Sequence, residues 1–376
     1  MRTKEALQAC GFLYDGYLMP ELTSLDVFPQ YVKQAAEEAV VRIDSNKNKD
    51  SVMFAFMSDI HYFPSVNHFV RLERTLNAYR YIQEKIGADM LVIGGDHTID
   101  GNKEYKKSFL TQLRMHFKDL KYFPINGNHD DGTIWDKAFV CQQQSTNHLT
   151  HDEMYNLFYD HVTDLGAQME SEALYYFLDD ATTKTRFVFL DSGDIPYLYE
   201  NEKLRYIGQD TYAYSQKQLD WLINKALVFS EEGWHVIFFS HTVSCNLKNY
   251  MKPEKDNDYM MPLFELVDTY KKGEKLNKIF YEKDFEVCVN VDFSNVTRAE
   301  VVAFFAGHFH VDRLDFTRED IPLVIVGNTG MYNSPGCVRT DGDKTELLFD
   351  VVTVNYDERK IYLTRVGCGT DRVVVF

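Results

Sequence analysis

The sequence predicts an α/β protein in which two mixed β-sheets pack face to face as a sandwich flanked by helices. In the first part of the chain, short apolar runs alternate with amphipathic helical segments, which is the pattern of a mainly parallel sheet covered by helices. In the last part, apolar runs follow one another without helices between them, which favours antiparallel strands joined by turns. The third observation is that several of these apolar runs are followed directly by aspartate, histidine or asparagine residues, as is common where strand ends form a functional site.

The elements can be placed in order along the chain. Residues 1–50 are predicted to form an N-terminal helical extension, with a helix over 29–43 whose apolar residues share one face. The core then begins at 52–57, a continuous apolar run typical of a strand buried on both faces. Further helices are expected over 69–86, 103–117 and 215–229, and further strands over 90–95, 122–126, 186–192, 235–240 and 301–307.

The remaining chain changes character. The stretches 131–185 and 243–300 fit no regular alternation, so we expect them to be insertions over one edge of the sheet. Antiparallel strands are predicted for the C-terminal part, over 314–317, 323–328, 347–355, 360–367 and 372–376.

Composition limits the classes of function. The chain has 376 residues, which is long for one domain but within reach of an open α/β sheet with insertions. A hydrophobic content of 45% allows a large core and argues against intrinsic disorder. Because 40 basic and 57 acidic residues give a net charge of −17, nucleic acid and anionic membranes are disfavoured as partners. A small anionic substrate is compatible with this charge if metals supply positive charge locally.

Neither a signal peptide nor a membrane-spanning helix is expected from the sequence. Gln8, Asp15 and Gly16 interrupt the apolar character of the first residues, so no signal peptide is expected. No window approaches the roughly 18 uninterrupted apolar residues of a membrane-spanning helix. The cysteines contain no CxxC pair, which predicts reduced thiols in a cytoplasmic protein. They are Cys10, Cys141, Cys245, Cys288, Cys337 and Cys368. The sequence does not indicate an oligomeric state.

Five short segments carry possible metal ligands, and each follows an apolar run. They supply carboxylates, imidazoles and one carboxamide but no thiolate, which suits two hard or borderline divalent metals. Because the carboxyl ends of strands in an open α/β sheet face one crevice, we expect the segments to converge. Glycines stand in them where the backbone must turn sharply. The segments are SDIH at 58–61, GGDH at 94–97, GNHD at 127–130, SHT at 240–242 and GHFH at 307–310.

This order of motifs resembles the calcineurin-like metallophosphoesterase family, which has the purple-acid-phosphatase-like fold, over roughly residues 52–330. The resemblance implies a metallophosphoesterase domain over 51–376 with a dinuclear site at the carboxyl edge of its sandwich. It also implies that His129 lies near the leaving-group oxygen as an acid or charge stabiliser, with Asp130 orienting or supporting it. The implied ligands are Asp59, His61 and His310 for the first metal, Asn128, His241 and His308 for the second, and Asp96 as the bridge.

The chemistry expected of such a centre is hydrolysis. Two cations about 3.5–4 Å apart can share a hydroxide whose pKa is depressed toward neutrality, and this hydroxide attacks phosphorus in line. The metals and His129 would neutralise charge on the phosphoryl oxygens and the leaving group. Asn128 is a neutral ligand, so the centre does not accumulate excess negative charge. Manganese, iron and zinc all suit oxygen and imidazole ligands, and the metal identity stays open.

Two further residues are candidate substrate contacts. Family members often read GDxxD or GDxxR at the second motif, but here Asp100 stands four positions after Asp96. His97 is expected to donate to substrate phosphate or to a ligand carboxylate, or to make a structural hydrogen bond in its loop. The glycine-rich segment 326–343 is expected to fold toward the metals, where Arg339 can grip phosphate in bidentate fashion.

The sequence therefore predicts metal-dependent hydrolysis of a phosphodiester or a small phosphomonoester. Two alternatives stay open, which are a nuclease of the same family and a non-catalytic scaffold or binding protein that retains the fold. The absence of a strongly basic segment disfavours the nuclease, and the complete ligand set disfavours the scaffold. Substrate choice is expected to reside in the two insertions, through aromatic and polar residues such as Trp135, Tyr155, Asn246 and Tyr250.

Overall fold

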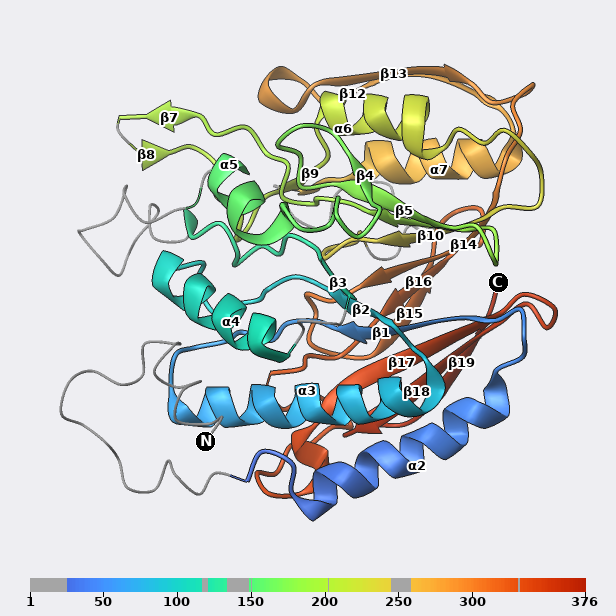
Figure 1. Cartoon of the computed structure of the whole chain (residues 1–376). Helices are drawn as coiled ribbons and strands as arrows, with labels where there is room; N and C mark the ends of the chain where they lie inside the picture. Colours follow the sequence, from blue (N-terminus) through green and yellow to red (C-terminus); the bar gives the residue numbers. More distant parts are fainter. Residues whose placement is uncertain are drawn as a thin grey trace.

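Two large β-sheets form the centre of the computed structural model, which describes residues 26–116, 121–133, 149, 151–201, 203–244, 258–330 and 332–376 (Figure 1). One sheet has six strands, in the order β19 (Arg372–Val375), β18 (Lys360–Gly367), β17 (Leu348–Asn355), β1 (Val52–Met57), β2 (Met90–Ile93) and β3 (Lys121–Pro124). The other has seven, in the order β15 (Arg313–Phe316), β16 (Pro322–Ile325), β14 (Glu300–Ala306), β10 (His235–Phe239), β6 (Thr185–Phe189), β5 (Tyr176–Asp180) and β4 (Gln168–Met169).

Both sheets are mixed. Strands β1, β2 and β3 run parallel, whereas β17 pairs antiparallel with both β1 and β18. In the second sheet β6, β10, β14 and β16 run parallel, and β5 and β15 are antiparallel additions at its two sides. The predicted fold class, two mixed sheets in a sandwich flanked by helices, is confirmed.

Helices cover the outer face of each sheet (Figure 1). On the first sheet α2 (Gln30–Asn46) and α3 (Val66–Ile86) lie side by side, and α4 (Lys103–His116) lies beyond them. The hydroxyl oxygen of Ser65 accepts a hydrogen bond from the backbone N–H of His68 and so caps the start of α3. The helix ends at Gly87, whose φ of 74° is left-handed. On the second sheet lie α6 (Gln216–Trp221), continued by one π-helical turn (Leu222–Ala226), and α7 (Met261–Lys272).

The two stretches predicted to be insertions contain short regular elements. Residues 151–185 contribute β4 and β5 to the side of the second sheet, and 258–300 contain α7 and a hairpin. Trp135, Asn246 and Tyr250 lie outside the described residues. The remaining elements are α5 (His151–Met154), a π-helical turn (Tyr155–Tyr159), the pairs β7 (Tyr199–Glu200) with β8 (Lys203–Leu204), β9 (Tyr212–Ala213) with β11 (Asp258–Tyr259) and β12 (Lys275–Phe280) with β13 (Val287–Asp292), and two 3-10 turns (Lys283–Phe285, Lys344–Glu346).

A disulfide joins Cys337 and Cys368, whose Cα atoms lie 5.7 Å apart. The expectation of reduced thiols throughout is therefore wrong for this pair. The two residues are 31 positions apart, with Cys337 in the loop between β16 and β17 and Cys368 directly after β18, and no local sequence signal marks the pair. Cys288 is a free, exposed thiol, and the other three cysteines lie outside the described residues. Within the described part of the chain, no helix is long and apolar enough to cross a membrane.

Aromatic rings from both sheets meet in the space between them. Phe54 on β1 is fully buried, and its ring meets rings of the opposite sheet edge-on. The centroid distances are 5.2 Å to Phe239 and 5.1 Å to Phe305. These contacts hold the carboxyl ends of β1, β10 and β14 at one edge of the sandwich, because β1 belongs to one sheet and the other two strands to the other.

We expect Phe54→Ala to lower the free energy of unfolding by about 3–5 kcal/mol, because it leaves a cavity between the sheets. Val41→Ala, at an exposed position of α2, serves as the matched control and should change it by less than about 0.5 kcal/mol. Urea denaturation of the metal-free protein measures both. Equal effects of the two substitutions would show that this ring contact does not hold the sheets together.

Candidate metal centre

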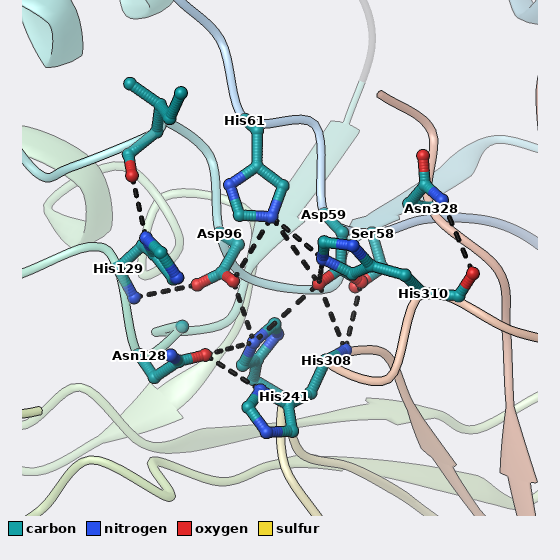
Figure 2. A network of polar contacts seen from close by, with 12 residues as sticks. Ser58, Asp59, His61, Asp96, Asn128, His129, His241, His308, His310 and Asn328 are labelled. Carbon is teal, nitrogen blue, oxygen red and sulfur yellow. Dashed lines mark hydrogen bonds and ion pairs between the residues drawn. The ribbon is translucent and has the colours of Figure 1, made fainter. Parts of the chain in front are cut away.

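The strand ends bring the predicted ligands together at one edge of the sandwich (Figure 2). Strand β1 ends just before Asp59 and His61, and β14 ends just before His308 and His310. Strands β2, β3 and β10 end within a few residues of the other ligands, which are Asp96, Asn128 and His241. Side chains from both sheets therefore meet, although the segments that carry them are far apart in the sequence.

The first group of ligands is compact. One ligand atom from each of Asp59, His61, Asp96 and His310 lies within 4.8 Å of the other three. The Nε2 atoms of His61 and His310 are 2.9 Å apart, and the Nε2 atom of His310 is 3.2 Å from an Asp59 oxygen. Two carboxylates and two imidazoles at this spacing are a donor set that divalent transition metals bind.

The second group of ligands surrounds the amide oxygen of Asn128. This oxygen is 3.0 Å from Nε2 of His241 and 2.9 Å from Nδ1 of His308. The Oδ2 atom of Asp96 connects the two groups, because it lies 3.3 Å from Nε2 of His241 and 3.5 Å from Nε2 of His61. The structure thus brings together all seven predicted ligands and places Asp96 between the two groups.

The hydrogen bonding of His241 indicates that a positive charge would stabilise this site. Its Nδ1 atom lies 2.7 Å from the carbonyl oxygen of Gly94, so this nitrogen carries a proton. A neutral ring then directs the lone pair of Nε2 at the oxygens of Asn128 and Asp96, which are also acceptors. Burial lowers the pKa of His241, but the neighbouring Asp96 and Asp59 outweigh it and raise this pKa to about 10. A divalent cation would satisfy these three acceptors together, so the residues present fit a metal.

The backbone at the ligands adopts an uncommon conformation. Left-handed φ angles are rare for residues other than glycine and gather at functional sites, where the surrounding structure enforces them. Here the backbone N–H of Asp59 donates to Gly95 and that of His61 to Asp96, at 3.0 and 2.9 Å, and these bonds fix the turn after β1. The residues with left-handed φ are Asp59 (54°), His61 (45°), Asp96 (51°), His308 (67°) and His310 (58°).

Glycines permit the close approach of the ligand segments. A Cβ atom on Gly127 would lie 2.1 Å from the backbone nitrogen of Asp96, and one on Gly307 would lie 2.4 Å from an Asp59 oxygen. Neither contact is possible for a larger residue. The glycines were expected to allow sharp turns, but at these two positions the structure needs them for space. Gly95, whose φ is 93°, needs the left-handed conformation as well.

Asp130 ties two of the ligand segments together from behind. Its carboxylate accepts hydrogen bonds from the backbone N–H groups of Gly127 and His97, at 2.8 and 2.9 Å. It also pairs with Nδ1 of His97 and with the ammonium group of Lys106, and all three side chains are completely buried. Burial raises the pKa of Asp130, but His97 and Lys106 outweigh it and hold this pKa well below its usual range. These hydrogen bonds of Asp130 fix the segments that carry Asp96 and Asn128 relative to each other.

The contacts of Asp130 define structural roles for His97 and Lys106. His97 was predicted to contact a substrate phosphate or a ligand carboxylate, or to make a structural hydrogen bond; its bond to Asp130 and its burial against the ring of Phe158 are the structural alternative. Lys106 was not predicted to take part. The sequence did contain a signal for this role. Lys106 stands one turn before Phe109 on the buried face of α4, and a lysine at a buried position needs a buried partner of opposite charge.

His129 lies beside the centre and is oriented by the backbone. Its N–H donates to an Asp96 oxygen at 2.8 Å, and its ring nitrogen Nδ1 lies 2.7 Å from the carbonyl oxygen of Ile99. The ring meets that of His61 edge-on at a centroid distance of 5.0 Å (Figure 2). Since Nδ1 donates to Ile99, Nε2 is left for the site. Asp130 was predicted to orient or support His129. Its hydrogen bonds go to the loop backbone and not to the ring of His129, so its role is support.

Arg339 holds a loop instead of reaching into the site. Its guanidinium donates all five of its hydrogens to backbone carbonyl oxygens, and the side chain is almost completely buried. This differs from the predicted bidentate phosphate contact, because no donor remains for a phosphate. The segment 326–343 does fold beside the ligands, as expected: the N–H of Gly330 donates to the carbonyl oxygen of Asp59 at 3.0 Å.

The fold and the site together define an α/β sandwich with a donor set for metal ions at one edge. The sequence pattern of the calcineurin-like phosphoesterases matches residues 52–312, and the chain belongs to this family. The resemblance seen in the order of the motifs is thereby confirmed.

A solved structure shares the fold of this chain. A dimetal phosphatase from Danio rerio (LOC 393393) is similar with a TM-score of 0.52 and 12% identity, over 86% of this chain and 98% of that chain. At this identity the likeness shows the fold alone. A phosphopantetheinyl hydrolase (PptH) from Mycobacterium tuberculosis matches with a TM-score of 0.36 and 12% identity, over 73% of this chain and 89% of that chain, which is too distant to carry an argument. No curated protein sequence matches the chain.

We expect Lys106→Met to lower the free energy of unfolding by about 3–5 kcal/mol, because it leaves the buried carboxylate of Asp130 without its cation. Adding Asp130→Asn should recover part of this loss, since it removes the unpaired charge. The control is Lys107→Met, at an exposed neighbour that pairs with Glu104 on the surface and should change stability by less than about 1 kcal/mol. Urea denaturation measures all three variants. A Lys106→Met variant as stable as the control would contradict the role given to this ion pair.

Proposed function

We propose that the chain is a hydrolase that uses two divalent metal ions to cleave a phosphodiester or a small phosphomonoester. One observation carries the proposal, namely that Oδ2 of Asp96 lies between His61 of one ligand group and His241 of the other, at 3.5 and 3.3 Å. A carboxylate shared in this way supports a dinuclear centre over a single metal. Membership of the calcineurin-like phosphoesterases supports phosphoester chemistry in general.

The two groups of side chains would each hold one ion. Asp59, His61 and His310 would bind the first, and Asn128, His241 and His308 the second, with Asp96 shared. When bound, two such ions lower the pKa of a water nucleophile and offset the negative charge of phosphoryl oxygens. We propose manganese, iron or zinc, since oxygen and imidazole ligands suit all three.

The neighbouring residues act on the phosphoester itself. With both ring nitrogens protonated, His129 would keep Nδ1–H on the carbonyl oxygen of Ile99 and donate a proton or a hydrogen bond from Nε2 to the leaving oxygen. Asn128 contributes an uncharged oxygen, and its amide nitrogen donates to the carbonyl oxygen of Gln209 at 3.1 Å, which fixes the direction of the Asn128 amide oxygen.

The net charge of −17 supports a small substrate over a nucleic acid, since the chain repels long polyanions.

Metal removal and restoration test the proposed activity. Protein freed of metal with a chelator should lose turnover of 4-nitrophenyl phosphate and bis(4-nitrophenyl) phosphate, and manganese, iron or zinc should restore at least one of them. Initial rates for each reconstituted form measure this. Metal-loaded protein that cleaves neither ester would contradict the proposal.

We expect His129→Ala to lower turnover by about two to four orders of magnitude, the range for loss of an acid or a charge stabiliser. Metal content should stay at the level of the unchanged protein, because the ring of His129 completes neither ligand group. His161→Ala is the control, since that ring lies against Tyr122 and no candidate ligand. Loss of metal together with unchanged turnover per bound metal would instead identify His129 as a ligand.

A further inference from the structure

An exposed tyrosine lies against two of the candidate ligands. The ring of Tyr332 stacks on that of His310, with centroids 5.4 Å apart and planes at 22°. It also meets the ring of His61 edge-on, again at 5.4 Å. The side chain is nevertheless 40% exposed. One part of the aromatic surface is therefore used against the ligands, and another part faces the solvent beside the centre.

The backbone of this tyrosine is fixed to the ligand segment by a buried asparagine. The side chain of Asn328 accepts a hydrogen bond from the N–H of Tyr332 and donates one to its carbonyl oxygen, both at 3.2 Å. The same amide nitrogen lies 3.4 Å from the carbonyl oxygen of His310 (Figure 2). Asn328 itself is completely buried. The position of Tyr332 thus follows that of His310 and does not depend on contacts at the surface.

The loop on either side of the tyrosine is held as firmly. Arg339 binds the carbonyl oxygens of residues 328, 329 and 330 before the tyrosine and those of 345 and 346 after it. The disulfide from Cys337 to Cys368 anchors the same loop to the residues that follow β18. A buried arginine, a buried asparagine and a disulfide together hold a loop whose ring at Tyr332 stays accessible, which indicates that this ring has a binding role.

We propose that Tyr332 is a specificity-determining residue, whose ring stacks on a planar aromatic group carried by the phosphoester; this rests on the proposed phosphoesterase function. The ring of His61 touches both His129, at 5.0 Å, and Tyr332, at 5.4 Å. A phosphoester held at the centre next to His129 thereby has its organic group within reach of the tyrosine. Aromatic rings bind one another in stacked or edge-on geometry more strongly than their buried area alone predicts.

Two esters of matched reactivity test this proposal. Benzyl phosphate and cyclohexylmethyl phosphate both release a primary alcohol of similar size, but only the first has an aromatic ring. The metal-loaded protein should prefer the benzyl ester in kcat/KM by about three- to tenfold, the worth of one stacking contact. Tyr332→Leu should remove this preference, and Tyr332→Phe should keep it. Tyr362→Leu is the matched control, because that tyrosine lies on β18 and contacts Glu358 and Lys360.

Binding separates this inference from the activity. The affinities of benzylphosphonate and cyclohexylmethylphosphonate for the metal-loaded protein, measured by calorimetry, require no turnover and should show the same preference and the same loss in Tyr332→Leu. Equal affinity and equal kcat/KM for the two members of each pair would overturn the role of Tyr332, as would a preference that survives in Tyr332→Leu. Absence of turnover with a preserved binding preference would overturn the proposed function but leave the aromatic platform in place.

Discussion

The close approach of two buried carboxylates is the constraint on which this site depends. Asp59 and Asp96 are almost fully inaccessible to water, and both lie within 4.0 Å of the same Nε2 atom of His61. Burying a charge costs several kcal/mol unless an opposite charge compensates it. Backbone N–H groups of His129 and His308 donate to these carboxylates, and the nearby ligand side chains are imidazoles and an amide. A full opposite charge therefore has to come from protons on the histidines or from cations. The left-handed backbone at five ligands and the glycines without room for a Cβ atom are features that bring these carboxylates together.

Much of the fold and the ligand set could be predicted because their signals are local. A continuous apolar run such as 52–57 identifies a buried strand, and a polar residue directly after it lies at the sheet edge. The seven ligand positions share this local pattern, and the structure places them together. Helix α7 was missed inside the stretch 243–300, although Pro262 at its start and Gly273 at its end are ordinary helix signals. The irregular sequence around it hid a regular element.

What could not be predicted depends on contacts between distant parts of the chain. Arg339 has the right chemistry for phosphate, and only the structure shows that five carbonyl oxygens occupy it. Asp130 stands beside His129 in the sequence, but its carboxylate turns to Lys106 on α4. The disulfide between Cys337 and Cys368 likewise has no spacing signal, and it removes part of the argument for a cytoplasmic location, which rested on reduced thiols. In each case the residue type indicated the possible chemistry, but the sequence did not reveal which group the side chain contacts.

If one carboxylate organises two metal ions, anomalous X-ray diffraction from crystals grown with manganese or zinc should reveal both ions. We expect two peaks about 3.5–4 Å apart. Oxygens of Asp96 should contact both ions, with Asp59, His61 and His310 around one and Asn128, His241 and His308 around the other. A single peak in fully metal-loaded protein, or two ions of which Asp96 contacts only one, would contradict this arrangement.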